Sequence, residues 1–83
     1  MSDNSATAKH LSFEWDAKGE RLEIHGNDKG LAALVGVLQS LIAKDENDHV
    51  HLMTPEWGGN TLSSDQQNSD AKLINHVKIL RWK

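Results

Sequence analysis

The chain has 83 residues, no cysteine and a net charge of −3, and these features exclude several classes of protein. Without cysteine it has neither a disulfide framework nor a thiolate metal site, so one modest hydrophobic core must stabilise it. The basic content is too weak for a typical nucleic-acid-binding protein. The longest mostly apolar run, residues 31–43, is too short to span a bilayer, and the polar residues 1–9 are not a signal peptide. We therefore expect a cytoplasmic protein without nucleic-acid or membrane partners.

Charge is unevenly distributed along the chain. Residues 44–71 contain six acidic residues and one lysine, whereas residues 72–83 contain four basic residues and no acidic one. We expect the basic tail to pair with acidic side chains elsewhere in the chain rather than with an anionic ligand.

The first part of the chain predicts a disordered leader followed by a β-hairpin. Residues 1–9 are polar, so we assign the leader to them and a single α+β domain to residues 10–83. Apolar and polar side chains alternate over residues 11–15 and again over residues 21–25, which is typical of two strands. The turn between them offers Gly19 for a left-handed position.

An amphipathic helix of about 16 residues is predicted next. Asn27 and Asp28 end the second strand and supply the N-cap, and the helix stops near Lys44. The apolar side chains recur at three- and four-residue spacing on one stripe, which we expect to form the core: Leu31, Leu34, Val35, Leu38, Leu41 and Ile42.

The segment after the helix begins as a strand and ends in a bend. Residues 48–53 alternate, Pro55 interrupts strand pairing, and Gly58 and Gly59 allow a sharp turn beside Trp57. Trp57 therefore has two interpretations. It is either an anchor held outward on the bend or a plug in the core beside the helix.

The remaining segments complete a small α+β fold. Residues 60–62 predict a short strand, and the polar residues 63–70, which have nothing to bury, predict a mobile surface loop. Residues 72–82 predict the final strand, with apolar side chains on both of its faces. The expected fold class is α+β, a small antiparallel sheet with one amphipathic helix packed on one face, in the order β-β-α-β-(β)-β.

The sheet face opposite the helix is expected to be open, because no second layer is predicted to cover it. Strand parity places on this face His10, His25, His49, His51 and His76, together with Glu14, Glu23, Met53, Leu80 and Trp82. The apolar side chains of Leu80 and Trp82 on an uncovered face give a reason for a homodimer.

The histidines raise the question of a metal, because the spacing of His49 and His51 puts two imidazoles on one side of a strand. No carboxylate spacing completes a ligand set, so we expect no metal and no cofactor. The sequence also lacks a phosphate-binding glycine loop, a nucleophile elbow and a zinc-protease motif, so we expect no enzymatic activity. A small metal- or ligand-binding domain that uses the histidine-rich face remains the alternative function.

Several motifs carry a family resemblance. They are His-Val-His-Leu at residues 49–52, Pro-Glu-Trp-Gly-Gly at 55–59 and Ile-Asn-His-Val-Lys-Ile at 74–79, followed by Trp82. In these motifs the chain resembles a family of small bacterial immunity proteins, the thirty-second of that kind, which accompany polymorphic toxin systems. The resemblance covers residues 11–82 and implies a protein that binds and neutralises a cognate toxin domain.

The partner-binding surface is expected around the central segment and the last tryptophan. The acidic region at residues 45–56 suits a basic partner such as a nuclease, because opposite charges steer association. The candidate partner-binding residues are Trp57, Glu56, Asp45, Glu46, Asp48, His49, His51 and Trp82.

Overall fold

The computed structural model describes residues 8–83, so residues 1–7 of the predicted leader lie outside the described part. The fold is α+β, with one helix and antiparallel strands in nearly the predicted order. Its elements are β1 (Leu11–Asp16), β2 (Arg21–Gly26), α1 (Asp28–Ala43), β3 (Asp48–Met53), the 3₁₀ turn η2 (Pro55–Trp57), β4 (Lys72–Ile74) and β5 (His76–Arg81).

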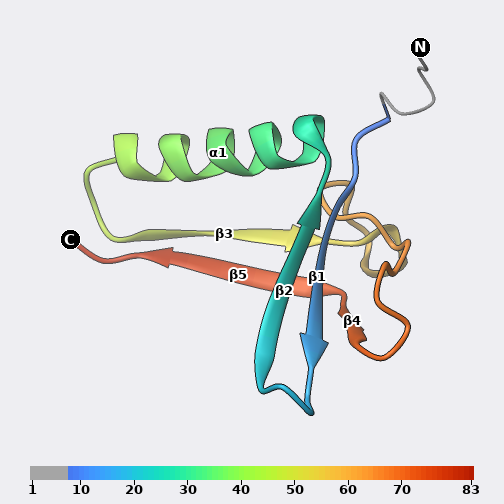
Figure 1. The fold of residues 1–83 in the computed structure, drawn as a ribbon. Helices are drawn as coiled ribbons and strands as arrows, with labels where there is room; N and C mark the ends of the chain where they lie inside the picture. The colour runs from blue at the N-terminus through green and yellow to red at the C-terminus, as the bar shows by residue number, and fades with distance from the viewer. Residues whose placement is uncertain (1–7) are drawn as a thin grey trace.

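The strands form two small sheets instead of the single predicted sheet. One sheet has the order β2-β1-β4 and the other pairs β3 with β5, all antiparallel. Figure 1 shows α1 lying along β3, while β1 and β2 run across the direction of β3 and β5. The predicted strand at residues 60–62 is wrong. Leu62 is instead one of the most buried side chains, with its backbone N–H donating to the Met53 carbonyl at 3.1 Å.

The final predicted strand is divided at Asn75, and this division explains its apolar side chains on both faces. β4 pairs with β1 before this residue, and β5 pairs with β3 after it. The break switches the parity, so that Ile74 from β4 and Val77 from β5 both pack against the same core. Thr54, which is fully buried, holds the crossing point: its backbone N–H and its hydroxyl donate to the Asn75 backbone and side-chain oxygens at 3.1 and 2.7 Å.

The β1–β2 hairpin shows the predicted alternation of apolar and polar side chains. Phe13 pairs with Ile24, and Leu11 and Phe13 are buried in the core. The left-handed position in the turn belongs to Glu20, at φ 51°, and not to Gly19 as predicted. The Gly19 N–H instead donates to the Asp16 carboxylate at 3.3 Å, which needs no left-handed backbone.

The start of the helix is pressed against β1. Asn27 is the N-cap, as predicted: its side-chain oxygen accepts hydrogen bonds from the backbone N–H groups of Gly30 (2.9 Å) and His10 (3.1 Å). A β-carbon at Gly30 would lie 1.7 Å from the His10 carbonyl oxygen, so only glycine fits there. The helix has the predicted 16 residues and ends at Ala43, with Lys44 as its C-cap.

The prediction that the whole apolar stripe of α1 faces the core is wrong for four of its six residues. Leu41 is 3% exposed and Leu34 packs against the core, whereas the other four are 39–66% exposed: Leu31, Val35, Leu38 and Ile42. The two sheets run in different directions, and the helix follows only β3. It therefore buries the side that carries Leu34, Val37 and Leu41 and leaves the stripe beside β2 open. Within residues 8–83, no helix has the length and hydrophobicity needed to cross a membrane.

Candidate partner-binding surface

The outer face of the β3–β5 sheet is the part of the structure that corresponds to the predicted open face. Val50 and Leu52 of β3, with Val77 and Ile79 of β5, are turned to the core. Because side chains alternate across a strand, the opposite face presents His49, His51, Met53, His76, Lys78 and Leu80. We call this the outer face. The five histidines are divided between two sheets, since His10 and His25 lie with β1 and β2, and this corrects the expectation of one shared face.

Three imidazoles meet on the outer face. The Nδ1 atom of His51 lies 2.7 Å from the Nε2 atom of His76, and the rings of His49 and His51 stack edge to face with centroids 5.0 Å apart. At 2.7 Å one nitrogen must donate its hydrogen while the other accepts it. Desolvation, followed by electrostatic interaction with His49, His76 and Lys78, lowers the pKa of His51. The lowered pKa favours the uncharged form of the His51 imidazole.

Trp57 lies at one end of the outer face and not in the core. It is 58% exposed, and its ring centroid is 6.0 Å from that of His76. The interpretation of Trp57 as a core plug is therefore wrong, and Leu62 fills that role. Glu56 is exposed on the same 3₁₀ turn.

The bend that carries Trp57 is rigidly defined by the two glycines after it. Gly58 has a left-handed backbone, at φ 85°, and its N–H donates to the Pro55 carbonyl at 2.9 Å. A β-carbon at Gly59 would come within 2.5 Å of the Met53 carbonyl oxygen. The glycines are thus structural, and they fix the direction in which the Trp57 ring leaves the chain.

Trp82 marks the other end of the outer face. It is 86% exposed, and Leu80 beside it is 52% exposed. A shallow depression between them and the start of β3 is lined by Asn47, Asp48, His49, Leu80, Arg81 and Trp82. The outer face therefore runs from one exposed tryptophan to the other, with the histidines between them.

Two of the four acidic residues at the rim, Asp45 and Asp48, form ion pairs with basic residues of the same chain. Arg81 makes an ion pair with Asp45 at 3.6 Å and donates to the Glu46 backbone carbonyl, while Lys44 lies 3.4 Å from Asp48. A hydrogen bond from the His49 backbone N–H, with help from Lys44, lowers the pKa of Asp48. The predicted pairing of the basic tail with acids of the same chain is confirmed for Arg81.

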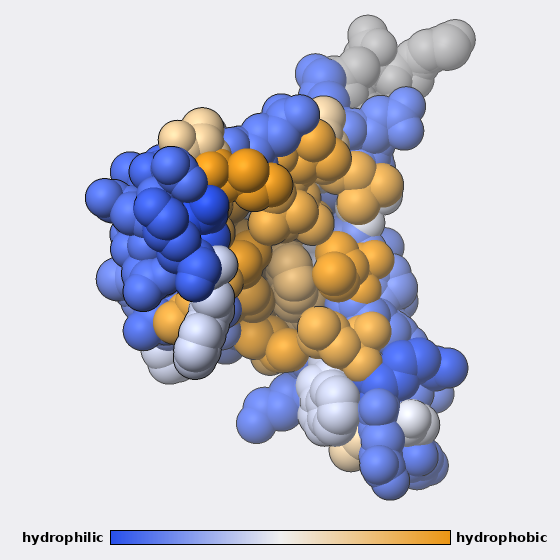
Figure 2. Space-filling view, turned by 90° about the vertical axis from the view of Figure 1, so that its left-hand side faces the viewer, coloured by the Kyte–Doolittle hydropathy of each residue, from blue (hydrophilic) through white to orange (hydrophobic). Residues whose placement is uncertain are grey.

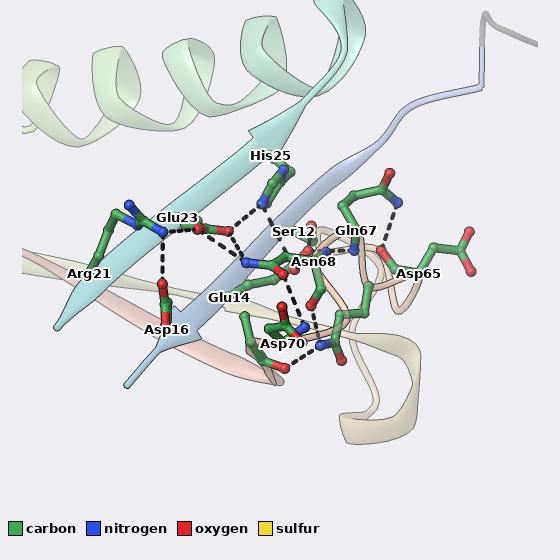
Figure 3. A network of polar contacts seen from close by, with 12 residues as sticks. Ser12, Glu14, Asp16, Arg21, Glu23, His25, Asp65, Gln67, Asn68 and Asp70 are labelled. Atoms are coloured by element: carbon green, nitrogen blue, oxygen red, sulfur yellow. Dashed lines mark hydrogen bonds and ion pairs between the residues drawn. The ribbon is translucent and has the colours of Figure 1, made fainter. Parts of the chain in front are cut away.

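A second polar site, which the sequence did not reveal, lies on the outer side of β1 and β2 (Figure 3). Glu14 has no exposed surface, and its carboxylate accepts hydrogen bonds from the Ser12 hydroxyl at 2.8 Å and from the backbone N–H groups of Gln67 and Asn68 at 2.9 and 2.8 Å. Burial raises the pKa of Glu14, but these donors outweigh it and the pKa is lowered. The expectation that residues 63–70 have nothing to bury is therefore wrong, because they form the lid over this carboxylate.

The same network includes the residue opposite Glu14. Glu23 pairs directly with Glu14 across the hairpin, and its carboxylate accepts from His25 at 2.9 Å and from the Asn68 side chain at 3.1 Å. Two carboxylates that lie opposite each other on paired strands repel and need such hydrogen-bond donors. The pairing of Glu14 with Glu23 in the predicted hairpin was therefore the one feature of the sequence that could have indicated this site. In residues 8–83, the group Glu14, Glu23 and His25 alone has a spacing that suits a metal ion. The Asn68 N–H groups point at these carboxylates, so a cation would meet donors where it needs acceptors.

Comparison of the chain with known protein families finds one match. Residues 21–77, about two-thirds of the chain, match the family model described as Immunity protein 32. The chain belongs to this family. The match confirms the resemblance and includes His49, His51, Trp57 and His76, but it ends before Trp82. No curated protein and no solved structure matches the chain.

Proposed function

We propose that the chain is an immunity protein that binds a cognate bacterial toxin domain and neutralises it by protein–protein contact, in the cytoplasm of the producing cell and without catalysis. Its family supports the class of function. The observation that carries the location of the binding site is the exposed Trp57 ring beside the His51–His76 pair, on a sheet face that no other element within residues 8–83 covers.

The chemistry of the outer face suits the centre of a protein interface. Between its two tryptophans the face carries one formal charge, Lys78, and otherwise imidazoles, Met53 and Leu80. Interface centres are enriched in tryptophan and depleted of acidic residues. The rim residues Asp45, Glu46, Asp48 and Glu56 then act mainly on the rate of association and its salt dependence.

Trp57 is expected to be the largest single contributor to toxin binding. Changing Trp57 to alanine should weaken binding by about 2 kcal/mol or more, roughly 30-fold, because a large ring that is buried on docking anchors an interface. The melting temperature should stay at the parental value, since the ring is 58% exposed in the free protein. Calorimetric titration with the cognate toxin domain measures the binding affinity, and a thermal melt measures the stability.

The matched control for this variant is Lys18→Ala, an exposed position in the β1–β2 turn, far from the outer face in the fold. It should bind and melt like the parent. A Trp57→Ala protein that is folded and neutralises the toxin at parental affinity would remove Trp57 from the binding site.

A metal-binding role is the second candidate, and the 2.7 Å approach of His51 and His76 is the observation that favours it. We still expect no stoichiometric metal, because two imidazoles that hydrogen-bond to each other lack the three or four ligands of a stable zinc site. Elemental analysis of protein purified without an affinity tag tests this. One zinc or nickel per chain, lost on changing His51 to alanine, would establish the metal-binding alternative.

A further inference from the structure

The open stripe of α1 is an unusual surface for a helix. From Gly30 to Ala43 the helix contains no charged residue, although much of it faces outward. Its exposed apolar residues, Leu31, Val35, Leu38 and Ile42, follow one another at intervals of four, three and four, so they form a straight seam. A helix without a polar face is normally buried on all sides.

The seam continues onto the neighbouring strand. A β-carbon at Gly26 of β2 would lie 2.9 Å from the Leu31 side chain, so the seam meets β2 directly. Leu22 and Ile24 of β2 are 51% and 46% exposed and share the sheet face of Phe13. Figure 2 shows the result as a broad hydrophobic surface with a hollow at its centre. We call this surface the apolar hollow; its residues are Leu22, Ile24, Leu31, Val35, Leu38 and Ile42.

The hydrophobic core of the folded chain is small beside this exposed apolar surface. Five hydrophobic side chains are buried in residues 8–83, whereas the apolar hollow holds six of the ten large hydrophobic residues that are exposed. A chain of this length without disulfides is marginally stable, and small proteins often gain the missing burial by association. An apolar surface that is left open also causes aggregation.

We propose that the apolar hollow binds the same surface of a second copy of the chain across a two-fold axis. A second copy is favoured over the toxin because the cover is needed whenever the chain is folded, before any toxin is met. The composition of the apolar hollow also favours a second copy, since homodimer interfaces are more apolar than interfaces between proteins that exist separately. The proposal leaves the outer face free, so it does not depend on the proposed function.

The seam has the symmetry that such a contact requires. A two-fold axis between Val35 and Leu38 makes the helices antiparallel, which places Leu31 of one copy beside Ile42 of the other. A standard interface takes about 800 Å² from each partner, which is one-seventh of the 5656 Å² surface of this protein.

The oligomeric state of the full chain tests the proposal. Light scattering at high micromolar concentration should report twice the chain mass of 9.2 kDa, and the melting temperature should rise with protein concentration. Changing Val35 to glutamate, at the middle of the seam, should halve the measured mass. The matched control is Leu80→Glu, which has nearly the same exposure, 52% against 50%, but lies on the outer face and should leave the dimer intact.

Ile42→Lys, at 66% exposure, provides a second seam variant if Val35→Glu is unfolded by circular dichroism. A monomeric parent protein overturns the proposal, and so does a dimer that dissociates with Leu80→Glu but persists in a folded seam variant. If the parent protein is monomeric and the Val35→Glu variant no longer binds the toxin, then the toxin occupies the apolar hollow, and this result also overturns the dimer proposal.

Discussion

Changing Gly30 to alanine is expected to unfold the protein or nearly so. The new β-carbon would lie 1.7 Å from the His10 carbonyl oxygen and 2.6 Å from its carbon, and both atoms belong to the backbone. This carbonyl accepts a hydrogen bond from the Asn27 N–H at 3.2 Å, so it is held against the helix start and does not move aside easily. The helix must lift from β1, at a cost of about 4 kcal/mol or more. The total stability of a small domain is about 5 kcal/mol.

Gly36 provides a matched control within the same helix. A β-carbon there would meet no atom within 4 Å, and the residue lies in the helix interior. Gly36→Ala should therefore stabilise the protein by about 1 kcal/mol, the difference in helix propensity between the two residues. Urea unfolding of both variants, followed by circular dichroism, gives the comparison. Equal stabilities for the two alanine variants would show that the helix start does not dock on β1 in this way.

The elements that were predictable from the sequence are those whose signals are local. The β1–β2 hairpin follows from alternation, and the bounds of α1 follow from the Asn27 cap and the apolar spacing. The rotation of the helix was not predictable, because it depends on the angle between two sheets that the sequence does not separate. The single residue Asn75 decides that separation through its contacts with Thr54, which lies 21 residues away.

The part of the candidate site that lies on regular strands was predictable, because strand alternation is a local signal. Parity alone placed His49, His51 and His76 on one face, since each lies in a regular strand. The Glu14 site was missed because two of its three hydrogen-bond donors are backbone N–H groups of a loop. Every residue type except proline has a backbone N–H, so the sequence does not indicate which of them will donate. The exposure of Trp57 was undecided for a similar reason, since the direction of a bend depends on the close packing of Gly59 against Met53.

Glu14 is expected to give the protein much of its acid sensitivity. The pKa of Glu14 is lowered in the folded state, so its ionised form contributes stability that is present above the unfolded-state pKa of about 4.3. This contribution is lost as the pH falls through the lower, folded-state pKa. Changing Glu14 to glutamine should cost about 1–3 kcal/mol at pH 7, because the amide has one acceptor oxygen for three donors and sets an N–H against one of them.

The Glu14→Gln variant should also lose part of the fall in stability below pH 4.3, while Glu23 and Asp48, whose pKa values are lowered too, keep the remainder. Urea unfolding at a series of pH values measures the cost and the slope. Hydrogen exchange of the Gln67 and Asn68 amides should accelerate in the variant, because both N–H groups lose their carboxylate acceptor. Glu20→Gln, at an exposed turn position, is the control and should leave all three measurements unchanged. Parental stability and parental amide exchange in Glu14→Gln would mean that residues 63–70 are held over the sheet by contacts other than this carboxylate.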